Sequence, residues 1–90
     1  MQVVIQVSAD VARALHRQSP PTAESEAFLK VTETFGLTLV PMHPGTDDPN
    51  LQSFFTVEVQ DQGTAQRLID RLQQLAGIEA AYVKPPDELP

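Results

Sequence analysis

The amino-acid sequence predicts an α+β fold in the order β-α-β-β-α-β, in which two helices cover one face of a four-stranded antiparallel sheet. Three observations lead to this prediction. The chain has 90 residues, 41% of them apolar, which suits one small domain with a thin core. Apolar side chains alternate along residues 2–7 and 54–60 with the period of two that is typical of half-buried strands. Between Ala65 and Ala76 they recur at the spacing of an amphipathic helix.

The first half of the chain supplies a strand, a short helical segment and a longer helix. Residues 2–7 form the strand. Residues 10–17 permit a short helix that ends at residues 19–21 (Ser-Pro-Pro), because the residue before a proline is disfavoured in the α region. Thr22 is a good N-cap for the next helix, whose first turn carries acidic side chains that the helix dipole favours. Gly36 is a suitable residue to end that helix.

The second half supplies three strands around the amphipathic helix. Residues 37–42 read as a strand, and Pro41 places it at a sheet edge because proline has no N–H to donate. A loop rich in Pro, Gly and Asp covers residues 43–50. Residues 54–60 and 78–83 complete the set. Right-handed crossovers then put the first and third strands in the centre of the sheet, which is the ferredoxin-like arrangement.

We expect one domain over residues 1–84, followed by an extended, proline-rich tail over residues 85–90. No apolar stretch approaches the ~18 residues that span a bilayer, so no membrane contact is expected. Met1 is followed by a strand pattern and not by the basic and apolar regions of a signal peptide, which predicts a cytoplasmic protein if Met1 is the native start.

Composition argues against several classes of protein. The net charge is −6, and only six Lys and Arg residues are scattered along the chain. A nucleic-acid partner is therefore not expected, because its phosphates are bound largely by basic side chains. The chain has no cysteine, which excludes disulfides, thiolate metal sites and a cysteine nucleophile.

No constellation of side chains indicates catalysis. His43 with Asp47 and Asp48 would form at most a weak metal site, since metal sites usually need three or four ligands at fixed spacing, and a solvated loop is the favoured interpretation. The other histidine, His16, lies in the short helical segment. None of the serines lies in a G-x-S-x-G turn, and the glycines are isolated. We therefore predict a domain that is not an enzyme, with no catalytic residue, cofactor or metal.

The sheet face that the helices leave uncovered is the most informative surface. Strand alternation assigns one set of side chains to the helix side, namely Val3, Ile5, Val7, Phe55, Val57, Val59, Ile78, Ala80 and Tyr82. It assigns the opposite set to the uncovered side, namely Val4, Gln6, Thr38, Val40, Phe54, Thr56, Glu58, Ala81 and Val83. More than half of this second set is apolar, whereas open antiparallel faces are usually polar. The pattern predicts a surface for a protein partner, with Phe54 as its anchor.

Three segments carry a resemblance to a known family. The stretch Phe55-Thr-Val-Glu-Val59, the helix Ala65–Leu75 and the strand Gly77-Ile-Glu-Ala-Ala-Tyr-Val83 resemble the second half of subtilisin-type propeptides and related stand-alone peptidase inhibitors. Residues 2–7 and 27–40 match the first half more loosely. The resemblance implies a non-catalytic domain whose open sheet docks on two surface helices of a subtilisin-like serine protease, in cis or in trans. It also implies action as an intramolecular chaperone and inhibitor.

The same resemblance implies that the tail lies extended in the substrate groove of the protease. The tail comprises Lys84, Pro85, Pro86, Asp87, Glu88, Leu89 and Pro90. It departs from the family pattern, in which acidic residues follow the last strand directly, because acids return here only after two prolines.

Two other classes remain as alternatives. A small-molecule regulatory module of the ACT kind shares the predicted fold, but it commonly has a glycine after the first strand, and residues 8–10 contain none. A structural dimerisation domain, paired with a second copy through the sheet, is the other alternative.

Overall fold

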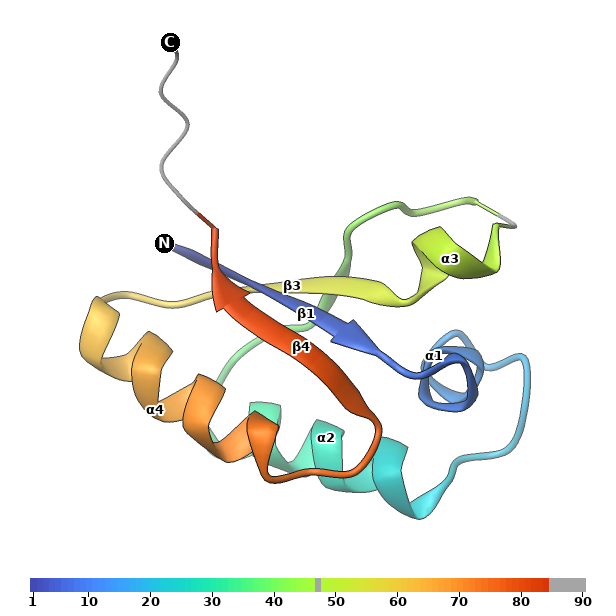
Figure 1. Ribbon diagram of the computed structural model, residues 1–90, viewed down its shortest axis with the longest axis horizontal. Helices are drawn as coiled ribbons and strands as arrows, with labels where there is room; N and C mark the ends of the chain where they lie inside the picture. Colours follow the sequence, from blue (N-terminus) through green and yellow to red (C-terminus); the bar gives the residue numbers. More distant parts are fainter. Residues whose placement is uncertain (47, 85–90) are drawn as a thin grey trace, which may run out of the picture.

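The computed structural model describes residues 1–46 and 48–84. It is an α+β fold in which helices pack on a four-stranded antiparallel sheet (Figure 1). The strands are β1 (Gln2–Val7), β2 (Val40–Pro41), β3 (Phe54–Glu58) and β4 (Ile78–Val83). The helices are α1 (Ala9–Leu15), α2 (Ala23–Thr34), α3 (Pro49–Gln52) and α4 (Gln62–Gln73). No helix within the described residues is long and apolar enough to cross a membrane.

The strand order is β2-β3-β1-β4, which confirms the predicted central position of the first and third strands. Strand β1 pairs antiparallel with β3 on one side and with β4 on the other, so that Ile5 lies between Phe55 and Ala81. Figure 1 shows α2 and α4 packed on the same side of the sheet, with α3 beyond the start of β3.

The chain departs from a strict β-α-β-β-α-β order because it contains two additional short helices, α1 and α3. Helix α1 begins directly after β1, where the Ser8 hydroxyl accepts a hydrogen bond from the Val11 N–H at 3.3 Å. Helix α3 lies in and just beyond the predicted loop, and the Asp48 carboxylate caps it by accepting from the Asn50 N–H at 2.9 Å. A helix of four residues has no room for a periodic apolar pattern, so the sequence pattern did not reveal α3.

The two long helices close the core, and Thr22 caps the first of them as the sequence predicted. Thr22 and Ser25 form a reciprocal capping box at the start of α2, with hydrogen bonds of 3.0 and 2.9 Å between side chains and backbone N–H groups. Helix α4 begins after Asp61. The core between helices and sheet contains Val3, Ile5, Val7, Val11, Ala12, Phe28, Val31, Phe55, Val57, Val59, Ala65, Leu68, Ile69 and Leu72.

Gly77 lets the chain turn tightly from α4 into β4. Its φ of +91° is one that side-chain-bearing residues rarely adopt. A Cβ atom there would lie 2.8 Å from Val11 Cγ2 and 3.2 Å from the Glu24 Cβ. The turn therefore packs directly against α1 and α2, which draws the helical layer together.

The second strand is shorter than predicted. Strand β2 comprises only Val40 and Pro41, with one further bond from the Met42 N–H to the Phe54 carbonyl at 3.0 Å, whereas the sequence predicted a strand over residues 37–42. The Leu37 N–H donates to the Thr32 carbonyl at 2.9 Å, which ties this residue to the end of α2. The edge position expected from Pro41 is confirmed.

Because β4 contains a β-bulge, the faces predicted for its residues after Glu79 are wrong. Val7 pairs with Ile78 and Gln6 with Ala80, so Glu79 is an extra residue in β4. Beyond Glu79, each residue of β4 faces the side of the sheet opposite to the one that simple alternation predicts. Ala81 and Val83, predicted for the uncovered side, pack against the core, and Ala80 and Tyr82, predicted for the helix side, lie on the uncovered side. Ile78, which precedes the bulge, faces the helices as predicted.

Candidate interaction surfaces

We call the helix-free side of the sheet the open face. The strand registers place on it Gln2, Val4 and Gln6 of β1, Phe54, Thr56 and Glu58 of β3, Val40 of β2, Ala80 and Tyr82 of β4, and Lys84. The structure thus brings together six of the nine residues predicted for this surface. Thr38 precedes β2 and is exposed, and Ala81 and Val83 belong to the other face.

On the open face the side chain of the central Val4 is buried, whereas large apolar side chains on the two edge strands are exposed. Val4 is only 1% exposed although no helix covers it, because Thr56 and Tyr82 flank it on the neighbouring strands. Val40 and Tyr82 are each 48% exposed, which is high for large apolar side chains. The face is therefore a shallow apolar surface with two projecting side chains, one on each edge strand.

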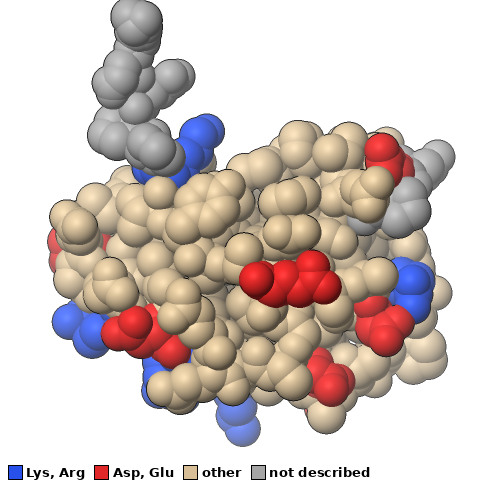
Figure 2. All heavy atoms as spheres, in the orientation of Figure 1, with Lys and Arg blue, Asp and Glu red and all other residues tan. Residues whose placement is uncertain are grey.

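Charged groups lie at one end of the open face. The amino group of Met1 is 2.6 Å from the Glu58 carboxylate, and Lys84 follows the end of the adjacent β4. In Figure 2 one acidic side chain lies in the middle of the view and the other charged side chains lie toward the periphery, while the upper part between them is largely uncharged. An uncharged centre with a charged margin is typical of protein-binding surfaces.

Phe54, the anchor predicted from sequence, is half-buried on the open face. The ring of His43 stands edge-on to it, with 6.4 Å between ring centroids. His43 thus contacts an aromatic side chain, while Asp47, one of the acids considered with it as a metal ligand, lies outside the described residues. Within residues 1–46 and 48–84, no three His, Asp or Glu side chains gather where they could hold a metal ion.

The predicted tail is described only at its first residue. Lys84 is exposed, and its N–H donates to the Gln2 carbonyl at 2.8 Å, so the chain stays in the sheet up to that point. Residues 85–90, which carry the rest of the tail prediction, lie outside the described residues.

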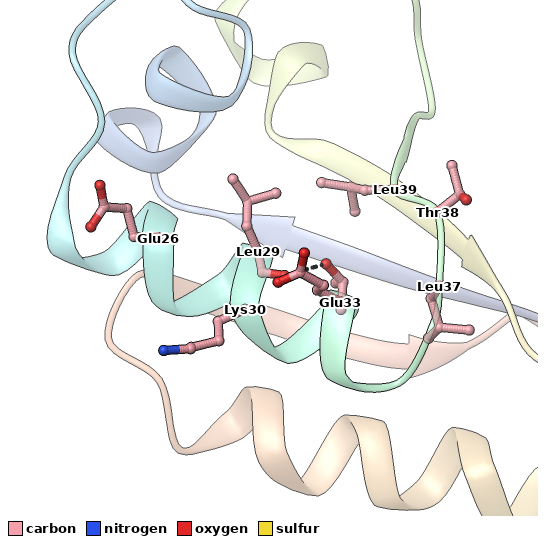
Figure 3. Close-up of a pocket in the computed structure, with 8 residues that line it drawn as sticks. Glu26, Leu29, Lys30, Glu33, Leu37, Thr38 and Leu39 are labelled. Carbon is pink, nitrogen blue, oxygen red and sulfur yellow. Dashed lines mark hydrogen bonds between the residues drawn. The ribbon is translucent and has the colours of Figure 1, made fainter.

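A groove on the helix side was not predicted from the sequence. It lies between α2 and the segment that leads into β2, and it has a hollow of about 670 Å³ (Figure 3). Leu29 and Leu39 point toward each other across it, with Leu37 at one end, while Glu26 and Lys30 lie along α2. Leu29 is 45% exposed and falls outside the apolar stripe of its helix, which is the signal that could have revealed the groove.

The groove continues toward α1 in a second hollow of about 630 Å³, which shares Leu29 and Leu39 with the first. His16 lines this part. Its ring packs on Phe55 at 5.3 Å between centroids, and its Nε2 is 3.0 Å from the Gln52 carbonyl oxygen. These contacts give His16 a structural role in joining α1 to α3 and β3.

The pKa of Asp61 is lowered by contacts at the start of α4. Thr64 donates from its backbone N–H to the Asp61 carboxylate at 2.7 Å, and this bond, assisted by the Thr64 hydroxyl and the charge of Arg67, holds the pKa of Asp61 below its ordinary value. Asp61 is exposed at the start of α4, so the perturbation reflects helix capping.

Comparison of the chain with protein-family models, with curated proteins and with solved structures found no match.

Proposed function

We propose that this chain is a non-catalytic interaction domain with a ferredoxin-like core, and that its open face docks on a protein partner. The partner that the resemblance favours is a subtilisin-like serine protease domain, encoded in cis or in trans. The domain would act on it as a chaperone and inhibitor. The single observation that carries the proposal is the open face itself, a helix-free sheet surface that is uncharged at its centre and exposes Val40 and Tyr82.

The physical argument concerns desolvation. Exposed apolar side chains gain free energy when a partner removes them from water, at roughly 25 cal/mol per Å². Phe54, Tyr82 and Val40 lie on three different strands, so one partner surface would cover all three at once. Their strands belong to a hydrogen-bonded sheet that is already formed, so little conformational entropy is lost on docking.

The tail supports the proposal through its chemistry. Prolines favour extended backbone, and an extended segment is the form in which a peptide occupies a protease substrate groove. Lys84 lies on the open face directly after the end of β4 and is still hydrogen-bonded to β1. A partner docked on that face would therefore receive the tail from its margin.

The ACT-like alternative receives less support. Its ligand would bind in the loop after the first strand, but here Ser8 passes directly into α1 and uses its hydroxyl to cap that helix.

The test is inhibition of purified subtilisin by the full chain and by two matched variants. Phe54→Asp introduces a charge on the open face and should raise the inhibition constant by about 30-fold or more, which corresponds to the hot-spot threshold of about 2 kcal/mol. Leu29→Asp places the same charge at an exposed apolar position on the helix side and should leave inhibition unchanged. Circular dichroism checks that both variants stay folded.

A chain without residues 85–90 separates the two parts of the proposal. It should still bind subtilisin, as measured by calorimetry, but it should no longer inhibit cleavage. Absence of binding by the full chain, or equal loss with Phe54→Asp and Leu29→Asp, would contradict the proposal.

A further inference from the structure

The two edges of the sheet are protected to different degrees. Strand β2 is only two residues long and contains Pro41, which has no N–H to offer another strand. Strand β4 is six residues long and contains no proline. Unpaired edge strands are templates for further pairing unless they are short, interrupted or charged, so β4 is the edge that remains available.

The hydrogen-bond phase shows which groups β4 offers. Lys84 donates its N–H to the carbonyl of Gln2 in β1 at 2.8 Å, so the N–H of Lys84 points toward β1. In an antiparallel ladder every second residue of a strand bonds to the same neighbour. The backbone N–H and C=O groups of Tyr82 and Ala80 therefore also point toward β1. The N–H and C=O groups of Ala81 and Val83 then point away from β1. Within the described residues, no strand pairs with that side of β4.

We propose that a second copy of this chain pairs antiparallel with β4, about a two-fold axis at Tyr82, and makes one eight-stranded sheet. In this register Tyr82 lies opposite the same residue of the second copy. Ala81 lies opposite Val83 and exchanges two hydrogen bonds with it, and Ala80 lies opposite Lys84. The pairing uses the regular part of β4, after the bulge at Glu79.

The strand is complementary to itself in this orientation. On the helix side the small Ala81 meets the larger Val83. On the open face Tyr82, now 48% exposed, gains an aromatic neighbour at a close, non-hydrogen-bonded position, where cross-strand aromatic pairs are favourable.

Charge selects the antiparallel orientation. Glu79 lies near the start of β4 and Lys84 directly after its end, and both are exposed. Antiparallel pairing places Lys84 of each copy opposite Ala80 of the other, and therefore one residue along the strand from Glu79. Parallel pairing would instead bring like charges together. The net charge of −6 on each copy opposes association, so the equilibrium should be measured at physiological ionic strength, where long-range repulsion is screened.

The first test is disulfide trapping, which a chain without cysteine permits directly. Tyr82→Cys should form a covalent dimer under mild oxidation, because opposite Cα atoms at a non-hydrogen-bonded antiparallel site are about 4.5 Å apart, within disulfide range. Ala80→Cys and Lys84→Cys should each cross-link poorly alone but should form a heterodimer when mixed. Leu29→Cys, on the helix side, is the exposed control.

The second test is association measured by sedimentation equilibrium. Glu79→Lys and Lys84→Glu place like charges together in their own homodimers, so each should weaken self-association several-fold. Their mixture should recover it, since both cross-strand contacts of the heterodimer are again attractive. Ala81→Pro removes an N–H that points away from β1 and should abolish the dimer without breaking the β1–β4 ladder.

These outcomes decide the proposal without a protease. A wild-type chain that stays monomeric up to about 1 mM would overturn it. It would equally be overturned if Ala80→Cys alone cross-linked as well as Tyr82→Cys, or if mixing the two charge variants gave no recovery. Phe54→Asp should leave dimerisation unchanged, so the failure of open-face docking and the failure of edge pairing are separately visible.

Discussion

The two faces of the sheet bury their side chains by different means. On the helix side Val3 and Ile5 are fully buried beneath α2 and α4, in a core that extends across all the long elements. On the open face Val4 is almost equally buried, but it lies outside the core cluster, with Thr56 and Tyr82 beside it on the neighbouring strands. Equal burial therefore does not mean equal packing, and only the open face retains a surface that a partner could cover.

This difference predicts unequal responses to mutation. A cavity beneath the helices is enclosed on all sides, so the surrounding structure relaxes only partly. A side chain removed from the open face leaves a depression that neighbours or water can fill. Stability should thus depend mainly on the helix side, and association on the open face and the β4 edge.

The largest effect is expected for leucines of α4. Leu68 and Leu72 lie on the apolar stripe of α4 and are 0% exposed. Either change to Ala should lower the free energy of unfolding by about 2–5 kcal/mol, the range for buried leucines. Leu29→Ala, at a helix position that is 45% exposed, should cost much less. Urea denaturation measures all three, and equal losses would mean that helix-side packing does not dominate stability.

A smaller effect separates the two faces within one strand. Val3→Ala and Val4→Ala remove the same two methyl groups from adjacent residues that are 0% and 1% exposed. We expect about 2 kcal/mol for Val3→Ala, from lost transfer free energy plus a cavity, and about 1 kcal/mol for Val4→Ala. Denaturant titration of both variants gives the difference directly. A larger cost at Val4 would show that the open face is as rigidly packed as the core.

The smallest effect concerns the cap of the helix that covers the core. The pKa of Asp61 is lowered in the folded chain, so its carboxylate contributes stability above its ordinary pKa of 3.8, and that contribution is lost as the pH falls through the lowered value. Asp61→Asn keeps an oxygen that can accept from the Thr64 N–H but does not titrate. The melting temperature of the wild type should therefore fall toward that of Asp61→Asn below about pH 4. Parallel curves from neutral to acidic pH would contradict this prediction.

Much of the architecture followed from the sequence because its signals are local. The stripe on α4, the alternation in β1 and β3, and the cap at Thr22 each depend on residues that lie close together in the sequence. Together with the handedness of crossovers they were sufficient to predict the strand order β2-β3-β1-β4. Pro41 fixed an edge by its missing N–H alone.

The features that only the tertiary structure decided depend on contacts between residues that are distant in the sequence. The bulge at Glu79 exists because β4 must follow both the ladder of β1 and the turn at Gly77, and no alternation within β4 itself reveals it. Leu29 and Leu39 form a groove only because α2 lies beside the approach to β2. The sequence by itself thus determined which elements form and in what order they pair. Only the packing of those elements decided that Tyr82 projects from the open face while Ala81 and Val83 lie against the core, because a single extra residue exchanges the two faces of a strand.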